Sequence, residues 1–343
     1  MAALRKINLR LNLKLQALIC TVLVSVNYAH AKDKAICVYQ GQDGQLVMTP
    51  GINQVPVKYR KQARCGEAIR NQELVDPSQV NLSGTVRNES FSTSLGRVNL
   101  RWQRDSEATF GRTPNRAVIA AMRSVSRALQ TPGFPDSLRN FSQEWNIVFM
   151  GEKVPLEQIP ISLVTNCHPG WMVPPNKVYV VAERVSAGCG NESNSSKRLS
   201  EQESDALLER ILIHEVGHAL EYQLLGHQSP HSLQAEGFAS WFEQYASRES
   251  AAVSSREVEG FYKQMAAESF KASPDHFNFS GSPYDYGRAS MYFKVIEKRY
   301  GVGGLMDLYK MMRTEAGDVF ISANKRWSLN PAQLNLAAKE LVK

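Results

Sequence analysis

Two histidines stand four residues apart in the stretch HEVGH, residues 214–218, with Glu215 between them. On a helix, side chains four positions apart project from the same face, so His214 and His218 can offer imidazole nitrogens to one metal ion. Glu215 follows His214 directly and can reach a water on that ion without being a ligand. Imidazole and carboxylate ligands suit Zn²⁺, which keeps one position open for water in hydrolytic sites and lowers the pKa of that water to about 7. The stretch therefore predicts a zinc-dependent hydrolytic site.

Whether these histidines bind a metal depends on a third ligand, because an ordinary amphipathic helix can carry the same five residues with its histidines packed or facing solvent. That ligand must come from another element, since three residues on one helical face would crowd the same side of the ion. Residues 235–246, AEGFASWFEQYA, follow a turn at 226–230 and predict a second helix beside the first. We expect Glu236, in the first turn of this helix, to face His214 and His218.

The stretch HEVGH followed by EGFASWFE resembles the gluzincin metallopeptidases, in which HExxH is followed by a glutamate in an E-G-x-A stretch on the next helix. The resemblance implies a zincin-like fold with one Zn²⁺ per chain. It also implies that His214, His218 and Glu236 are the zinc ligands and that Glu215 is the general base.

A hydrolytic zinc site also needs a donor for the oxyanion that forms when water attacks a carbonyl. The stretch SPYDYGRASMYF, residues 282–293, is similar to the P-Y-x-x-G segment of the aminopeptidase N and leukotriene hydrolase family. Tyr284 matches the tyrosine that is this donor in the family. The alternative is an ordinary turn before a helix, with tyrosines that cover the core. Asp285 is an alternative metal ligand, although Glu236 fits the helix geometry better.

Candidate substrate contacts lie in two segments. Gluzincins commonly bind a peptide along an edge strand above the metal. Residues 174–185, PPNKVYVVAERV, precede the metal-binding helix and predict this strand, with Val178 and Val180 as contacts. His227 and His231 lie in the predicted loop after that helix, and the nine-residue spacing from His218 to His227 does not fit the shorter metzincin pattern. We expect both to be loop residues, with His231 a candidate substrate contact.

The aminopeptidases of this family recognise the free amino end of the substrate through a Gly-x-Met-Glu-Asn segment. Residues 170–176, GWMVPPN, lack the glutamate of that segment. We therefore expect a peptide or protein substrate and favour an endopeptidase over an aminopeptidase. One alternative is a catalytically silent protein of the same fold that binds a peptide or a cell-envelope partner, and another is a structural protein with an accidental motif. The presence of Glu215 favours the peptidase, because a binding protein has no need of a base.

The first 31 residues have the pattern of an export signal. Four basic residues accompany an apolar run at 17–26, and Ala29-His30-Ala31 gives a small-x-small cleavage pattern. We therefore expect a periplasmic or secreted protein cleaved near Ala31. No stretch approaches the roughly 20 apolar residues of a transmembrane helix. The formal net charge of +7 includes the four basic residues of the signal, so the remaining excess is too small to predict a nucleic-acid partner. The oligomeric state is left open.

Four of the five cysteines follow the signal, an even number in a chain predicted to enter an oxidising compartment. Three pairings are possible. We favour Cys37 with Cys65 and Cys167 with Cys189, because each pair brackets a compact, turn-rich segment. A cysteine zinc site is not expected, because structural sites usually place two cysteines two to four residues apart and none of these cysteines lie so close.

The chain is expected to divide into three parts after the signal. Residues 32–70 predict a small disulfide-stapled β-hairpin unit with a turn at Asp43-Gly44, and they resemble the hairpin domain that opens many exported bacterial proteins. The polar residues 71–97 predict a linker, and residues 98–343 predict the metallopeptidase domain.

The metallopeptidase domain is expected to have its strands first and most of its helices afterwards, which predicts an α+β fold with a small mixed sheet and a mostly helical C-terminal half. The main helix is expected to be capped by Ser200 and Glu203 and to end before Gly226. The other expected helices are at 114–129, 232–246, 257–270, 288–300, 305–314 and from 330 onward, and the expected strands are at 145–150, 161–165 and 178–185.

Overall fold

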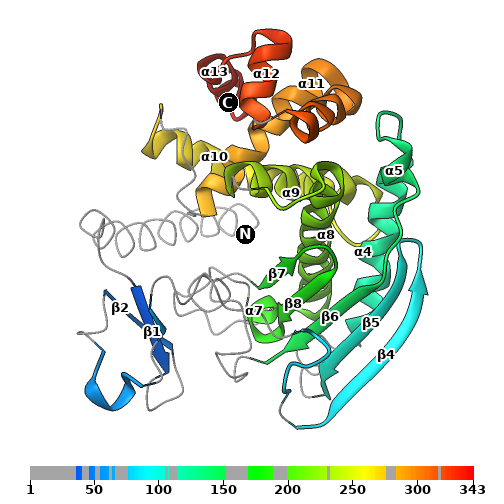
Figure 1. The fold of residues 1–343 in the computed structure, drawn as a ribbon, viewed down its shortest axis with the longest axis vertical. Helices are drawn as coiled ribbons and strands as arrows, with labels where there is room; N and C mark the ends of the chain where they lie inside the picture. Colours follow the sequence, from blue (N-terminus) through cyan, green and yellow to red (C-terminus); the bar gives the residue numbers. More distant parts are fainter. Residues whose placement is uncertain are drawn as a thin grey trace, which may run out of the picture.

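The computed structural model describes residues 36–40, 46–50, 55–61, 64–65, 76–82, 84–104, 107, 114–151, 169–187, 199–229, 232–275, 283–315 and 318–343. All described strands lie before residue 182, with helical segments between some of them, and helices form the described regular structure from residue 201 onward. The described fold is therefore α+β, as predicted. Figure 1 shows the main sheet on one side of the molecule and the C-terminal helices gathered on the other.

A five-stranded mixed sheet has the order β4-β5-β6-β8-β7. Its strands are β4 (Val86–Thr93), β5 (Gly96–Gln103), β6 (Trp145–Met150), β7 (Gly170–Val173) and β8 (Lys177–Val181). β4 is antiparallel to β5, the strands β5, β6 and β8 are parallel, and β7 is antiparallel to β8. Two parallel strands need a crossover connection, and α4 (Pro114–Leu129) and α5 (Asp136–Arg139) lie in the one from β5 to β6.

Both faces of the central strands are covered. Trp145, Ile147 and Phe149 of β6 belong to the main core with α4 and α8 (Glu201–Leu225), whereas Val148 and Met150 belong to a second cluster on the opposite face. Alternate residues of a strand face opposite sides of its sheet. A strand buried on both faces has an almost continuous apolar sequence, and β6, WNIVFM, fits that pattern.

Two expected segments differ from the structure. The predicted linker at 71–97 contains β4, which pairs along its whole length with β5. None of its side chains is buried, so β4 lacks the apolar alternation that would indicate a strand. The strand expected at 178–185 ends at Val181, because α7 (Ala182–Ala187) begins there. The strand expected at 161–165 lies outside the described residues.

The C-terminal half contains α8, α9 (Ser232–Ala246), η5 (Ser247–Glu249), α10 (Ser255–Ala272), α11 (Pro283–Thr314), α12 (Val319–Trp327) and α13 (Pro331–Leu341). The predicted start and end of α8 are confirmed, with a capping box of Ser200 and Glu203 and a left-handed Gly226 at φ 80°. The helices expected at 288–300 and 305–314 are the two halves of α11, which is interrupted at Gly301 with φ 70°. α12 was not predicted.

The N-terminal unit contains β1 (Ile36–Gln40), β2 (Leu46–Pro50), η2 (Val57–Tyr59) and β3 (Arg64–Cys65), and its sheet order is β2-β1-β3. β1 and β2 pair antiparallel, as predicted for the hairpin. The register between β1 and β3 places Cys37 opposite Cys65. Opposed residues of antiparallel strands have Cα atoms about 4.5–5.5 Å apart, a separation that suits a disulfide. The bond itself stays a prediction, and Cys167 and Cys189 lie outside the described residues.

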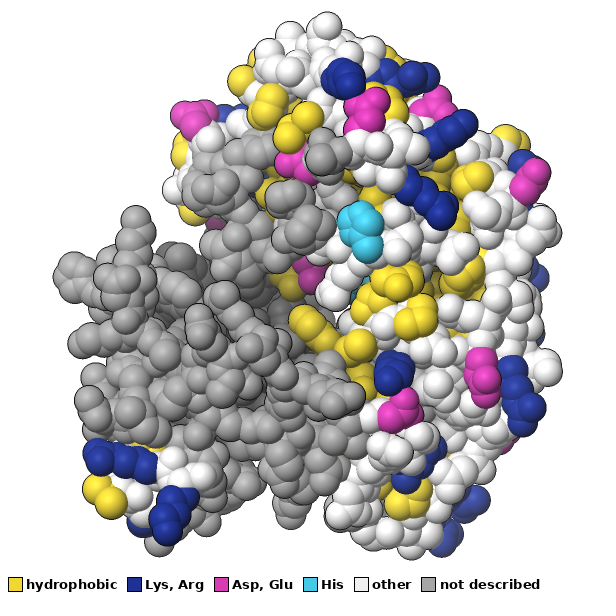
Figure 2. Space-filling view, viewed as in Figure 1, with side chains coloured by type: hydrophobic (Ala, Val, Ile, Leu, Met, Phe, Trp, Pro, Cys, Tyr) yellow, Lys and Arg dark blue, Asp and Glu magenta, His cyan; other side chains and the backbone are white. Residues whose placement is uncertain are grey.

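In the described part of the chain, no helix has both the length and the apolar character needed to cross a bilayer. Figure 2 shows basic and acidic side chains interspersed over the described surface of one face. On that face, the fields of the two kinds of charge therefore offset one another.

Candidate metal centre

His214 and His218 lie in the middle of α8, one turn apart. Leu212, Ile213 and Val216 around them are almost fully buried, so the motif is carried by a helix packed on several sides. The imidazole rings are edge to face, with centroids 5.0 Å apart. Both histidines therefore project from one face of a packed helix.

Small residues allow α9 to approach α8 closely. A Cβ atom on Gly217 would lie 3.0 Å from the Cα atom of Ala239. On α9, a Cβ atom on Gly237 would lie 2.6 Å from the ring of Phe293, which belongs to α11. Glycine at these two positions therefore lets α9 fit between α8 and α11, and this brings Glu236 to the histidines.

The three predicted ligands converge. Oε2 of Glu236 lies 3.2 Å from Nε2 of His214 and 3.4 Å from Nε2 of His218. Among the described residues, these three side chains form a group in which one ligand atom from each lies within 4.8 Å of the others. All three are partly buried, with 14–17% of each side chain exposed. The group can therefore bind a metal ion that still has access to solvent.

The spacing of these donor atoms fits a tetrahedral ion. Zn²⁺ binds imidazole nitrogen and carboxylate oxygen at about 2.0–2.2 Å, which separates two ligand atoms of a tetrahedron by about 3.3–3.5 Å. The two nitrogen–oxygen distances, 3.2 and 3.4 Å, match this separation within a few tenths of an ångström. Two imidazoles and one carboxylate also form the donor set of hydrolytic zinc sites with an open position. The residues present therefore fit zinc in their donor types and in these two separations.

The charges within this group stabilise one another. Burial acts to lower the pKa of His214, but its contacts with Glu236 and Glu243 raise that pKa to about 10. Burial acts to raise the pKa of Glu236, yet the neighbouring His218 and His214 hold it well below its usual range. A divalent cation would replace the imidazole protons as the partner of Glu236, so metal binding should release protons.

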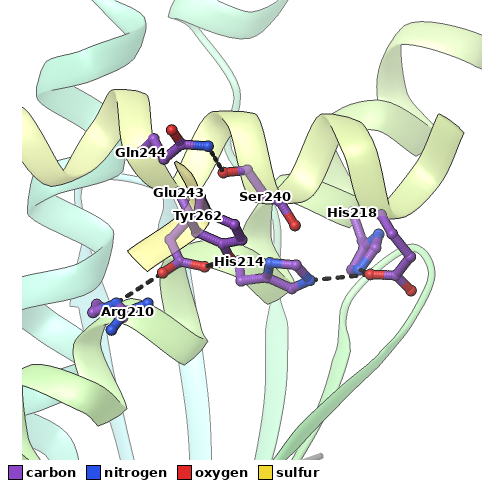
Figure 3. A network of polar contacts seen from close by, with 8 residues as sticks. Arg210, His214, His218, Ser240, Glu243, Gln244 and Tyr262 are labelled. Carbon is purple, nitrogen blue, oxygen red and sulfur yellow. Dashed lines mark hydrogen bonds and ion pairs between the residues drawn. The ribbon is translucent and has the colours of Figure 1, made fainter. Parts of the chain in front are cut away.

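Glu243 supports the imidazole of His214 from the other side. Its Oε2 atom lies 3.4 Å from Nδ1 of His214 and accepts a hydrogen bond of 2.5 Å from the Tyr262 hydroxyl. Its Oε1 atom accepts a hydrogen bond of 2.8 Å from Nε of Arg210. Burial acts to raise the pKa of Glu243, but the Arg210 guanidinium and His214 lower it. Figure 3 shows this carboxylate between Arg210 and His214.

Glu215 lies beside the backbone of β7. A Cβ atom on Gly170 would be 2.8 Å from Oε1 of Glu215 and 2.6 Å from Cγ2 of Ile211, so only glycine fits at this position without a shift. Glu215 is 6% exposed. Burial raises the pKa of its carboxyl, while His214 and His218 act in the opposite direction. A raised pKa makes a carboxylate a stronger base, which suits the predicted role.

A tyrosine other than the predicted one lies beside His214. The ring of Tyr286 has its centroid 6.3 Å from that of His214. Burial raises the pKa of the Tyr286 hydroxyl, and the charges of Glu236 and Glu215 raise it further, which indicates that both carboxylates are near. Tyr284 precedes it by two positions in the same first turn of α11. Residues two apart on a helix project to nearly opposite sides, so the two tyrosines do not share a direction.

Sequence reasoning missed Tyr286, Glu243, Arg210 and Tyr262. The stretch PYDY contains both tyrosines, and they differ only in the direction in which each side chain projects from the helix. The position of Glu243 could have been predicted from the sequence, because it lies seven residues after Glu236 and therefore on the same helical face. Arg210 similarly lies four residues before His214. Tyr262, on α10, gave no comparable signal.

The predicted substrate-binding strand was expected at the edge of the sheet, and that position is wrong. β8, which carries Val178 and Val180, lies between β6 and β7 and pairs with both. The two side chains are 1% and 0% exposed, so they belong to the core and do not contact substrate. Among the described strands, β7 is at the sheet edge nearest this centre. His231 lies outside the described residues.

A comparison with protein-family models finds no matching family, and a comparison with curated proteins finds no significant match. The function of this chain is therefore inferred from the geometry and chemistry of this site.

Proposed function

We propose that this protein is a zinc-dependent peptide hydrolase of the gluzincin type, with a zincin-like fold. The observation that carries the proposal is the convergence of three donor atoms, Nε2 of His214, Nε2 of His218 and Oε2 of Glu236, with nitrogen–oxygen separations of 3.2 and 3.4 Å. The buried carboxylate of Glu215 lies next to this group on the same helix. Three ligands and an adjacent base are the protein components that a hydrolytic zinc site requires.

Each side chain then has a distinct role. His214, His218 and Glu236 hold the ion, and zinc when bound supplies Lewis acidity that lowers the pKa of a coordinated water to about 7. Glu215 accepts the proton of the attacking water and later donates it to the leaving amine. Burial, which raises the pKa of Glu215, favours this exchange near neutral pH.

The developing oxyanion needs a hydrogen-bond donor, and we assign this role to Tyr286. Its ring packs beside His214, and the raised pKa keeps its hydroxyl protonated and able to donate at neutral pH. Tyr284, the residue that the family pattern implies, is the alternative donor and projects to the other side of the first turn of α11. Replacing each tyrosine by phenylalanine separates the two assignments.

We propose that an extended segment of a peptide or protein substrate pairs with β7. This strand is at the edge of the described sheet, and its residue Gly170 lies against Glu215. An added strand is held by backbone hydrogen bonds, which positions a peptide bond without requiring a free amino end. An endopeptidase is therefore favoured over an aminopeptidase. From the signal-like first 31 residues, we further propose that the protein acts in the periplasm or after secretion.

Elemental analysis and peptide digestion on the same samples test this proposal. The wild type should bind one zinc per chain and cleave members of a peptide library. The matched variant Glu215→Gln keeps the size of the side chain but lacks a base, so it should retain zinc and lose cleavage. His214→Ala should lose both. A wild type that binds no zinc would refute the proposal. A wild type that holds zinc but leaves every peptide intact would identify the catalytically silent binding protein.

A further inference from the structure

We propose that Gln234 and Glu221 are positioning residues that hold the start of α9, and with it Glu236, in place for the metal, and that Gln234 couples the metal group to the start of α12. The inference rests on the proposed zinc site and deepens it. Neither Gln234 nor Glu221 is among the three proposed ligands.

Gln234 makes a hydrogen bond at each end of its carboxamide group. Its Nε2 atom donates to Oε1 of Glu221 at 3.3 Å, and its Oε1 atom accepts from the backbone N–H of Val319 at 3.0 Å. A backbone N–H can only donate, so the carboxamide oxygen faces Val319 and the nitrogen faces Glu221. The same Oε1 atom of Glu221 accepts from the Tyr309 hydroxyl at 3.0 Å. Gln234 and Glu221 are 2% and 3% exposed, so these bonds form away from bulk water.

The bond to Val319 completes the N-terminal cap of α12. The first four N–H groups of a helix have no partner within the helix. Asp318 accepts from three of them, two through its side chain and one through its carbonyl oxygen. The fourth is the N–H of Val319, and its partner is Gln234 of α9. The start of α12 is therefore attached to the start of α9.

The pair of Gln234 and Glu221 lies at one of three levels at which α9 meets α8. Arg210 contacts Glu243, the two histidines contact Glu236, and Glu221 contacts Gln234. The residue numbers rise along α8 as they fall along α9, so the two helices run antiparallel. The metal group is the middle level, and its ligand on α9 therefore has a polar contact between the helices on each side.

The position of Gln234 within α9 explains why its bonds matter for the metal. Gln234 is the third residue of this helix and Glu236 is the fifth. Helix ends are the parts of a helix that open most readily. On the C-terminal side of Glu236, Gly237 packs against the ring of Phe293. The bonds of Gln234 restrain the N-terminal side, and a ligand that is less restrained binds zinc less tightly.

Replacing Gln234 by methionine removes both hydrogen bonds and keeps an unbranched side chain. We expect Gln234→Met to weaken zinc binding about 10-fold, the lower end of the effect of residues that orient metal ligands. Competition with a chelator measures the zinc affinity. Urea unfolding of the chelator-treated protein measures the stability of the same variant.

Gln103→Met is the matched control. Gln103 is also a buried glutamine, and its Oε1 atom also accepts from a backbone N–H, that of Gly151, but it lies on β5. This variant should lose stability, because a buried donor loses its partner, and should bind zinc like the wild type. The comparison separates a positioning role from a general loss of stability.

Exchanging the two side chains tests the pairing itself. In Gln234→Glu two carboxylates would face each other, so zinc binding should weaken at least as much as in Gln234→Met. The double variant Glu221→Gln/Gln234→Glu again pairs an amide with a carboxylate, and the new carboxylate can still accept from Val319. It should therefore restore most of the zinc affinity that Gln234→Glu loses.

Coupling between two sites is reciprocal, so zinc should stabilise the contact at Val319 by the factor that this contact contributes to zinc affinity. Bound zinc should therefore slow amide hydrogen exchange at Val319 about 10-fold in the wild type, and more than at Gly151. This measurement needs no variant, so it tests the proposal even if Gln234→Met does not fold.

Three results would refute the positioning role while the zinc site stands. They are wild-type zinc affinity in Gln234→Met, an equal loss of affinity in Gln103→Met, and exchange at Val319 that zinc leaves unchanged. A double variant that binds zinc no better than Gln234→Glu would refute the pairing with Glu221. If the wild type binds no zinc, the proposed function fails first.

Discussion

Replacing Gly170 by alanine tests whether Glu215 is the base. The added methyl group would lie 2.8 Å from Oε1 of Glu215 and 2.6 Å from Cγ2 of Ile211. Non-bonded carbon contacts settle at about 3.5–4.0 Å, so the neighbours must move by about 1 Å. The backbone of β7 is held by its pairing with β8, and we therefore expect the Glu215 carboxylate to move.

A misplacement of about 1 Å in a catalytic site costs about 100-fold in rate. We expect kcat/KM for a cleaved library peptide to fall by about this factor in Gly170→Ala. Bound zinc should stay at the wild-type level, because His214, His218 and Glu236 are not the side chains that the methyl group meets. Peptide cleavage and zinc content are measured on the same preparation.

Gly260→Ala is the control for adding a methyl group. Gly260 lies on α10, and a Cβ atom there would meet no other atom within 4 Å. This variant should cleave peptides at the wild-type rate and gain about 0.5–1 kcal/mol of stability from the helix preference of alanine. Wild-type activity in Gly170→Ala, or a loss of zinc equal to the loss of rate, would contradict the placement of Glu215 as base.

Three further predictions follow from the site and its surroundings. Tyr286→Phe should lower kcat by about 100-fold with zinc content unchanged, as expected for loss of an oxyanion donor; a larger effect of Tyr284→Phe in the same peptide assay would reverse the assignment. Burial raises the pKa of Glu221 from 4.5 to about 7. The folded protein therefore keeps a proton that the unfolded chain releases, and the chelator-treated protein should lose about 3 kcal/mol of stability as the pH rises from 4.5 to about 7. Glu221→Gln should lack this loss in urea unfolding, since its amide oxygen can still accept from Tyr309 and Gln234, and an identical pH profile would exclude Glu221 as the source. Free zinc at 100 times its Kd should stabilise the wild type by about 2.7 kcal/mol in thermal unfolding but leave His214→Ala unchanged, and equal stabilisation of both would place the zinc elsewhere.

Local sequence signals were sufficient to predict many of the helices. The capping box at Ser200 and the left-handed stop at Gly226 bound α8 as expected, and Asn330 caps α13. These signals work because a helix terminus is satisfied by side chains within a few residues of it. α12 was not predicted, although its cap is also local, because the Asp318 side chain accepts from the backbone N–H groups of Phe320 and Ile321.

Strands were harder to locate, because their stability depends on partners far along the chain. β4 has a polar sequence, since it is an edge strand whose side chains are not buried. β8 was correctly expected as a strand, but its neighbours could not be read from its sequence. Only the order β6-β8-β7 makes it an interior strand and moves the edge to β7.

For the candidate site, the sequence by itself was sufficient to predict the three side chains that converge, His214, His218 and Glu236. His214 and His218 share a face because they are four residues apart on one helix, and Glu236 follows on the next helix after a short turn. The tertiary structure decided what surrounds them. Tyr286 beside His214, Gly170 against Glu215, and Tyr262 on Glu243 all depend on how separate elements pack. Helical periodicity is a local property that a short sequence carries, whereas contacts between elements arise only when the whole core is assembled.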